Sequence, residues 1–196
     1  DYTGEQQNLT TSLGVTGTLG DYELELSWAY GTSDYTRLGR NQMKADQLLK
    51  IITLDPAQAS NPAKWYPMNP LTSAQRDQLY ADTLTDAGSG LNQYSAVLTG
   101  DWFQLPAGPV QFAASAEWAK EWYFDYKDAD TTSGNLLGQG GTQGEGGRKR
   151  YAAAGELALP LLTSDSAIGQ LDASLALRHD RYDDRSDVGG ATTPQL

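Results

Sequence analysis

The segment GDWFQLPAGPVQFAASAEW, residues 100–118, decides the fold class of this chain. A Pro-Ala-Gly-Pro turn separates two runs in which apolar and polar residues alternate. Trp102 stands on the apolar side of the first run, and Phe112 and Trp118 stand on the apolar side of the second, opposite Glu117. Successive side chains of a strand point to opposite faces. The segment therefore predicts a β-hairpin with one apolar and one polar face.

The same alternation recurs along the chain. It predicts strands at about 6–19, 21–32, 91–104, 109–125, 148–161 and 169–182. The connections alternate between tight turns and long polar stretches, the latter at about 33–90, 126–147 and 183–191. Short turns at one end of a sheet and long loops at the other are typical of outer-membrane barrels. We therefore predict an all-β fold, a segment of an antiparallel up-and-down transmembrane β-barrel with short periplasmic turns and long extracellular loops.

The first long connection also contains helical patterns. Residues 43–54 (MKADQLLKIITL) have apolar residues at roughly helical spacing. Thr72-Ser73 predicts a cap for a second helix within SAQRDQLYADTL, residues 73–84. We expect short helices in this loop and a low-complexity loop in the glycine-rich stretch SGNLLGQGGTQGEGG.

Composition excludes several classes of function. The 196 residues have a formal net charge of −11, no cysteine and one histidine. An acidic chain is a poor partner for nucleic acid. Without cysteine there is no disulfide or thiolate metal site, and one histidine argues against zinc or histidine catalysis, so we predict no cofactor. No apolar run is long enough for a membrane helix. Both ends carry strand-like patterns, and we interpret the chain as an internal piece of a longer protein.

Glutamates recur on the polar sides of the predicted strands. They are Glu23, Glu25, Glu117, Glu121 and Glu156. Paired carboxylates at suitable spacing hydrolyse glycosides. A water-filled lumen explains the pattern better, because porin-type interiors are polar along every strand. We predict that these glutamates and Arg178 face a lumen, where Arg178 and Arg150 pair with some of them.

Aromatic residues gather on the apolar sides, mostly near strand ends. They are Trp28, Tyr30, Trp102, Phe112, Trp118 and Trp122. We interpret them as membrane-interface residues, because amphipathic rings suit the headgroup zone; packing between two sheets is the alternative. His179 shares the apolar side and is interpreted as an interface histidine.

An acidic run near the C-terminus could suit calcium. It consists of Asp180, Asp183, Asp184 and Asp187. Calcium prefers such oxygen ligands, but the ordered EF-hand spacing is missing. We interpret the run as a solvated loop and assign no metal site.

Several segments resemble TonB-dependent outer-membrane receptors. DWFQLPAGPVQFAASAEW is similar to a barrel hairpin of that family, and the turn is fairly specific to it. ELELSWAYGTSDYTR, YPMNPLTSAQRDQL, RKRYAAAGELALPLLT and LDASLALRHDRYDDRSDVGGATTPQL resemble other barrel segments in the same order. Family loops often carry a cysteine pair near the segment that corresponds to YPMNPLTSAQRDQL, where this chain has Trp65 and Tyr66.

The resemblance implies a location in the cell outer membrane and a transporter rather than an enzyme. It implies a 22-stranded barrel with a plug domain, which this chain does not contain, and coupling to the TonB complex. The implied ligand is a siderophore, cobalamin, a glycan or a similar scarce compound. The partners are outer-membrane lipid, this ligand and other outer-membrane proteins. Aromatic and polar groups on the loops or upper lumen are the expected ligand contacts: Trp65, Tyr66, Tyr123, Asp125 and Tyr126.

Two other classes remain open from the residues alone. A soluble β-sandwich, either carbohydrate-binding or glycan-active, would pack the tryptophan-rich faces against each other in a dry core. A passive porin-type or autotransporter barrel would share the wall pattern without TonB coupling.

Overall fold

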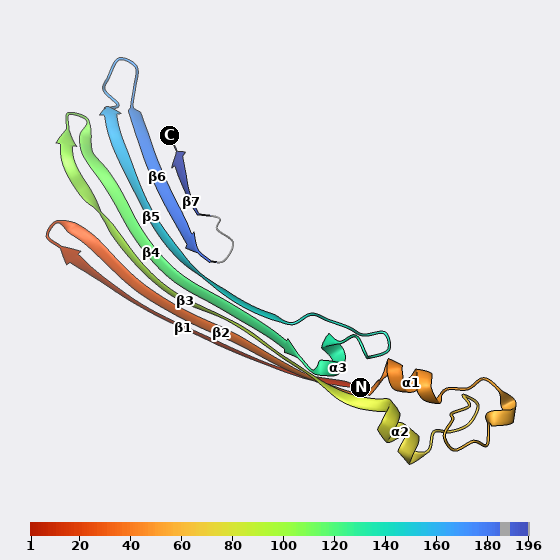
Figure 1. Ribbon diagram of the computed structural model, residues 1–196. Coiled ribbons are helices and arrows are strands. Elements are labelled where there is room, and N and C mark those ends of the chain that lie inside the picture. The colour runs from red at the N-terminus through yellow and green to blue at the C-terminus, as the bar shows by residue number, and fades with distance from the viewer. Residues whose placement is uncertain (185–188, 196) are drawn as a thin grey trace. The chain divides into compact units, whose positions relative to one another are not determined.

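The computed structural model describes residues 1–184 and 189–195. They form one seven-stranded antiparallel sheet in which strands lie in chain order (Figure 1). The strands are β1 Tyr2–Leu19, β2 Tyr22–Met43, β3 Tyr80–Leu105, β4 Gly108–Lys127, β5 Gly144–Leu162, β6 Leu171–Asp183 and β7 Gly190–Gln195. The predicted all-β, up-and-down architecture is confirmed. The sheet is not closed into a barrel, and β1 and β7 form its edges.

The strands extend beyond the ranges read from the sequence. β2 continues to Met43 and β3 begins at Tyr80, in the range 33–90 that was predicted to be a loop. The added segments carry polar residues on both sides, so they lack the period-two pattern on which the prediction depends. β7 is a seventh strand outside the six predicted ones. It pairs with β6 from Gly190 to Gln195.

The short connections agree in place with the expected turns. β1 and β2 join through Gly20 and Asp21, and β3 and β4 join through Pro106 and Ala107. Gly20 has a φ of 65°, a left-handed conformation that glycine adopts without a steric penalty. Such two-residue turns suit the twist of paired antiparallel strands. The connection between β5 and β6 is longer, at residues 163–170.

The chain divides into two compact units. The loop unit comprises Asp1–Gln7, Ser33–Gly88 and Tyr123–Glu145. The sheet unit comprises Asn8–Thr32, Ser89–Trp122 and Gly146–Leu196. All short helices lie in the loop unit: α1 Ala45–Ile51, η1 Pro56–Gln58, α2 Ser73–Leu79 and α3 Ala129–Thr132. No helix in the described residues is long and apolar enough to cross a membrane.

The helix α2 begins where the sequence indicates. The Thr72 hydroxyl accepts a 3.2 Å hydrogen bond from the Gln75 backbone N–H, and the Gln75 side-chain oxygen Oε1 accepts one of 3.0 Å from the Thr72 backbone N–H. This capping box satisfies two amide groups at the helix start. The helix ends at Leu79, earlier than the predicted pattern, because the chain enters β3 at Tyr80. The helix α3 lies in the second loop, for which no helix was predicted.

The loop unit has a small core of its own. The side chains of Ile51, Leu79 and Leu136 are almost completely buried. Backbone bridges hold the surrounding loops: Lys44 pairs with Leu136 in antiparallel fashion. The long loop is therefore a packed structure with its own apolar centre.

The sheet unit has two chemically distinct faces and little core. Its buried residues among those described are Val110, Ala119 and Ala152. Large apolar side chains remain exposed along one face, which we call the apolar face. Examples are Leu13, Leu26, Trp102, Leu175 and Leu177, each 43–64% exposed. The described residues supply no second layer over this face.

Candidate functional site

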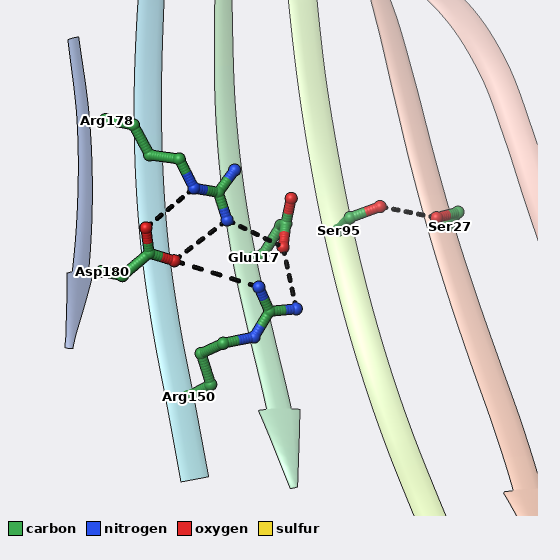
Figure 2. Close-up of polar contacts among 6 residues, drawn as sticks. All are labelled: Ser27, Ser95, Glu117, Arg150, Arg178 and Asp180. Carbon is green, nitrogen blue, oxygen red and sulfur yellow. Dashed lines mark hydrogen bonds and ion pairs between the residues drawn. The ribbon is translucent and has the colours of Figure 1, made fainter. Parts of the chain in front are cut away.

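The opposite, polar face of the sheet unit carries a group of charged side chains, which we call the charged network. Its members are Glu117 and Glu121 on β4, Arg148 and Arg150 on β5, and Arg178 and Asp180 on β6. Within each strand the two members are separated by an even number of positions, so they point to the same side. Figure 2 shows four of them gathered above three neighbouring strands.

Two arginines bridge Glu117 and Asp180. The Arg150 guanidinium lies 3.1 Å from the Glu117 carboxylate and 3.9 Å from that of Asp180. Arg178 lies 3.6 Å from Glu117 and donates hydrogen bonds of 2.8 and 3.0 Å to Asp180. Each carboxylate thus meets two guanidinium groups, and the four charges alternate in a ring (Figure 2). Hydrogen bonds between charged groups are stronger than neutral ones, and shared partners reduce the entropy lost per pair.

Small residues on the middle strand make this ring possible. In the pairing of β5 with β6, Ala152 lies opposite Asp180 and Ala154 lies opposite Arg178. Neither alanine extends above the sheet, so the two β6 side chains can reach across β5 toward Glu117 on β4. Ala152 is only 7% exposed. Larger residues at these two positions would separate the charges.

A second ion pair extends the network along β4 and β5. The Arg148 Nε donates to a carboxylate oxygen of Glu121 at 2.5 Å. The same guanidinium lies 5.3 Å from the centroid of the Tyr182 ring on β6, a cation–π distance. Both contacts join neighbouring strands, as the ring does.

The chemistry of this network is compensation of charge. Each of its three carboxylates is matched by an arginine, so none stands as a free acid or base beside a second carboxylate. Glycoside hydrolysis needs two carboxyl groups facing one bond. The network offers none, because guanidinium groups stand between its carboxylates. Within residues 1–184 and 189–195, no cluster of histidine, aspartate and glutamate could hold a metal ion. Asp187 of the acidic run lies outside the described residues.

All six residues predicted to face a lumen share the polar face. Glu117, Glu121 and Arg178 belong to the charged network. Glu23 and Glu25 lie on the same side of β2 as Ser27, whose hydroxyl lies 2.6 Å from that of Ser95 on β3 (Figure 2). Glu156 follows Arg150 on the same side of β5, opposite Ala176. The expected pairing of Arg150 and Arg178 with carboxylates is observed.

The six predicted interface aromatics belong to the apolar face by alternation. Phe112 contacts the Tyr22 ring edge-on at 5.2 Å, and Trp118 lies 5.7 Å from Tyr94. The other four predicted interface aromatics have the same parity on their strands: Trp28, Tyr30, Trp102 and Trp122. The Trp28 indole N–H donates a 2.7 Å hydrogen bond to Asn92, and its ring stacks 6.3 Å from Tyr30. His179, on the same face, shares a 2.8 Å hydrogen bond with Thr192 of β7.

The five predicted ligand contacts all lie in the loop unit, in two groups. Trp65 and Tyr66 form the first group, and both are half-buried. The backbone of Trp65 pairs with the segment after α1, and its indole N–H donates to the Asn69 carbonyl oxygen at 3.0 Å. The Trp65 indole is therefore already hydrogen-bonded within the loop.

The second group lies at the end of β4. Tyr123 is 55% exposed. It lies on the same side of β4 as Asp125, whose carboxylate forms an ion pair with the Lys127 ammonium. Tyr126 points to the other side, stacks on Phe124 at 5.3 Å and donates a short hydrogen bond to Glu145. Among the described residues, no hydrogen bond or ring contact joins this group to Trp65 or Tyr66. The structure thus does not gather the five residues into one site.

Asp128 organises the second long loop. Its carboxylate accepts hydrogen bonds from the Thr131 amide at 2.9 Å, the Thr131 hydroxyl at 2.8 Å and the Leu84 amide at 3.1 Å. Burial disfavours the charged form of Asp128, but these hydrogen bonds outweigh it and hold its pKa below the usual value. The residue caps α3 and ties it to β3.

Sequence reasoning missed three features of the charged network. It assigned Asp180 to the acidic run, although Asp180 lies on the same side of β6 as Arg178. It gave no role to Arg148. It gave no role to Ala152 and Ala154, because their importance depends on the pairing register, which the pattern of one strand does not contain.

Comparisons with protein-family models, with curated proteins and with solved structures find no match to this chain.

Proposed function

We propose that the sheet unit is part of the wall of a transmembrane β-barrel in a bacterial outer membrane. The observation that carries this proposal is the distribution of residues between the two faces. Large apolar side chains stay exposed on one face, and the charged network lies on the other. A barrel wall needs this arrangement, with lipid outside and a polar lumen inside.

The same observation speaks against a soluble β-sandwich. A sandwich buries the inner faces of two sheets against each other. The described residues form one sheet, and exposed apolar side chains run across its strands from Leu13 to Leu177. An uncovered apolar surface of this extent marks a site of contact with lipid or another protein.

We further propose that the barrel is an active-transport receptor coupled to TonB. This step rests on the resemblance of the hairpin around Pro106 and of the segments that follow it in order. The loop unit supports it, because a packed structure at the long connections can shape a ligand surface better than an irregular loop. In this proposal the ligand is a scarce nutrient such as a siderophore, cobalamin or a glycan. Its contacts come from Trp65, Tyr66, Tyr123, Asp125 and Tyr126.

A cysteine scan along β6 of the intact protein tests the membrane location. The chain has no cysteine, so within these 196 residues each introduced label has a defined position. Spin labels at 173–178 in reconstituted vesicles should alternate in accessibility. Labels at 173, 175 and 177 should collide with oxygen dissolved in the bilayer, and labels at 174, 176 and 178 with a water-soluble nickel complex. Equal accessibility to the nickel complex at all six positions would contradict a lipid-facing wall.

Uptake by cells tests the coupling. Cells that express the intact protein would be given radiolabelled ferric siderophores, cobalamin and malto-oligosaccharides, with and without a functional TonB. We expect one class of compound to accumulate only when TonB is functional. Accumulation that is equal in both strains would identify a passive pore. Absence of any uptake from the panel, together with correct membrane insertion, would count against transport of these ligand classes.

A further inference from the structure

Three cations stand on the apolar face of the sheet unit. They are Lys120 on β4, Lys149 on β5 and Arg181 on β6, and we call them the cationic rim. Alternation assigns Lys120 to the side of Trp118, Lys149 to that of Tyr151 and Arg181 to that of His179. All three side chains are exposed. Charged groups on a predominantly apolar face call for an explanation.

The pairing of β5 with β6 brings Lys149 and Arg181 close together. Arg181 lies opposite Tyr151, and Lys149 lies opposite Asp183 one step further along the same face. Opposed and diagonal side chains on one face of an antiparallel pair lie within reach of each other. The Asp183 carboxylate offsets part of the positive charge of Lys149 and Arg181.

Lys120 joins them from β4. A side chain at Gly147 would meet the Glu121 backbone oxygen at 3.0 Å, so Gly147 of β5 lies beside Glu121. Arg148 is also ion-paired to Glu121. The strands are antiparallel, so one step from the Glu121–Arg148 pair, back along β4 and forward along β5, leads to Lys120 beside Lys149. The rim is therefore continuous across three strands and has an excess of positive charge.

The rim differs from the arginines of the polar face in one respect. Arg148, Arg150 and Arg178 each have a carboxylate partner. The side chains of the rim cations have no hydrogen bond or ion pair in residues 1–184 and 189–195. Among the described residues, the same three strands pair their cations with carboxylates on the polar face and leave the rim side chains without an ion pair on the apolar face. In a chain of net charge −11, three cations with one neighbouring carboxylate, Asp183, leave an excess of positive charge that suits an anionic partner.

Below the rim, small residues leave two grooves on the apolar face. The upper one, of about 730 Å³, is lined by Ala116, Tyr151 and Ala153 and, toward the rim, by His179, Arg181 and Asp183. The lower one, of about 630 Å³, is almost wholly apolar; its lining includes Phe112, Ala114, Gly155, Leu157, Leu175 and Leu177. Ala153 and Gly155 follow one another on the apolar side of β5, so the grooves succeed each other along the strands. From residue 149 to 157 this track measures about 26 Å, at roughly 3.3 Å per residue.

We propose that the cationic rim binds the phosphate of a membrane lipid and that an acyl chain of this lipid lies in the grooves below. The inference rests on the proposed membrane location. Lys and Arg supply charge-assisted hydrogen bonds to phosphate oxygens, and Trp118 and Tyr151 supply the amphipathic rings of a headgroup zone. A cationic end and an apolar track match the two ends of one lipid molecule. A free phosphate would use the rim and leave the track without a ligand.

The test uses the intact protein in vesicles of phosphatidylcholine with or without one fifth phosphatidylglycerol. Lipid that remains bound after detergent extraction is counted by native mass spectrometry. We expect retained phosphatidylglycerol in the wild type, and a roughly tenfold to thirtyfold weaker preference in the double variant Lys149→Gln/Arg181→Gln, in line with the attraction of single basic residues to anionic lipid. Equal retention in wild type and variant would overturn the proposal.

Two controls separate charge from folding. The variant Arg40→Gln/Lys50→Gln removes two exposed cations from the loop unit and should keep the preference. The variant Lys149→Arg/Arg181→Lys keeps the charge and should keep the preference as well. If either control loses the preference as the test variant does, a specific rim is ruled out.

Two further outcomes identify the source of failure. Soluble glycerol 3-phosphate should not displace the lipid at equal concentration; complete displacement would indicate a phosphate site without a role for the acyl chain. Flotation of the vesicles reports insertion independently. A protein that inserts but shows no lipid preference refutes the rim alone, whereas a protein that does not insert refutes the membrane proposal.

Discussion

The loop unit buries several large apolar side chains and the sheet unit buries hardly any, although both units also expose some, such as Leu49 and Leu175. In the loop unit, Ile51, Leu79 and Leu136 are at most 4% exposed and form a core. In the sheet unit, the largest buried side chain among those described is Val110, whereas leucines such as Leu175 and Leu177 remain exposed. The loop unit follows the rule for folding in water. The sheet unit reverses it.

The polar groups differ in the same sense. In the loop unit the buried polar side chains are neutral, such as Gln75 and Thr131, and they hold helix ends and loops. In the sheet unit, charged side chains form a ring across three strands. Under the proposal of a barrel wall, the comparison means that each unit meets a different solvent, and each prediction below tests one side of it.

The largest effect is expected in the core of the loop unit. Leu79→Ala removes the completely buried side chain at the end of α2. It should lower the free energy of unfolding of this unit by about 2–5 kcal/mol, through lost burial and a cavity. Hydrogen exchange of the α2 amides measures it. Leu49→Ala on α1, where the side chain is 77% exposed, is the control and should change exchange little; equal effects would show that the core is not packed as described.

A slightly smaller effect is expected on the apolar face. Leu175→Arg places a charge where the proposal puts lipid, and should cost about 2–4 kcal/mol near the middle of the bilayer. Ser174→Arg, one residue earlier and on the polar face, should cost much less. Urea titration of folding into vesicles gives both values. If the two variants were equally stable, the distinction between the faces would lose its basis.

The sequence predicts the sheet well where one face is apolar. The segment from Trp102 to Trp118 alternates strictly, so its hairpin and both its faces can be read directly. The ends of β2 and β3, near Met43 and Tyr80, are polar on both sides. No periodic pattern is present there, and pairing with neighbouring strands alone makes them strands. Tertiary context overrides local pattern at these points.

The helix cap at Thr72 and the charged network also differ in how far the sequence predicts them. Thr72 predicts its helix start because a cap is a local interaction with Gln75. The ring of Glu117, Arg150, Arg178 and Asp180 depends on three strands and their register. The polar side of each strand could be read from the sequence, but the partners could not. Whether the five predicted ligand contacts of the loop unit lie together depends on loop packing, which the sequence pattern does not contain either.

A moderate effect is expected in the charged network. Glu117→Gln leaves Arg150 and Arg178 with Asp180 as their remaining carboxylate partner. We expect a loss of about 1–2 kcal/mol in the free energy of unfolding, because the pairs are only partly exposed. Glu25→Gln on the same face is the matched control and should have almost no effect. Repeating both in 1 M salt should reduce the difference, since salt screens the lost pairs; a difference that does not change with salt would mean that the ring contributes through shape rather than charge.

The smallest effect concerns Asp128 and pH. Its pKa is lowered in the folded protein, so its carboxylate contributes stability above its ordinary pKa of 3.8, and this contribution disappears as the pH falls through the lower folded value. Protection of the Leu84 and Thr131 amides, corrected for intrinsic exchange, should therefore fall below about pH 4. Asp128→Asn keeps an acceptor at the cap but has no charge to titrate, so its protection should stay flat over the same range. If wild type and variant fell in parallel, the loss would belong to the loop unit as a whole, because only the titration of Asp128 itself can separate the two curves.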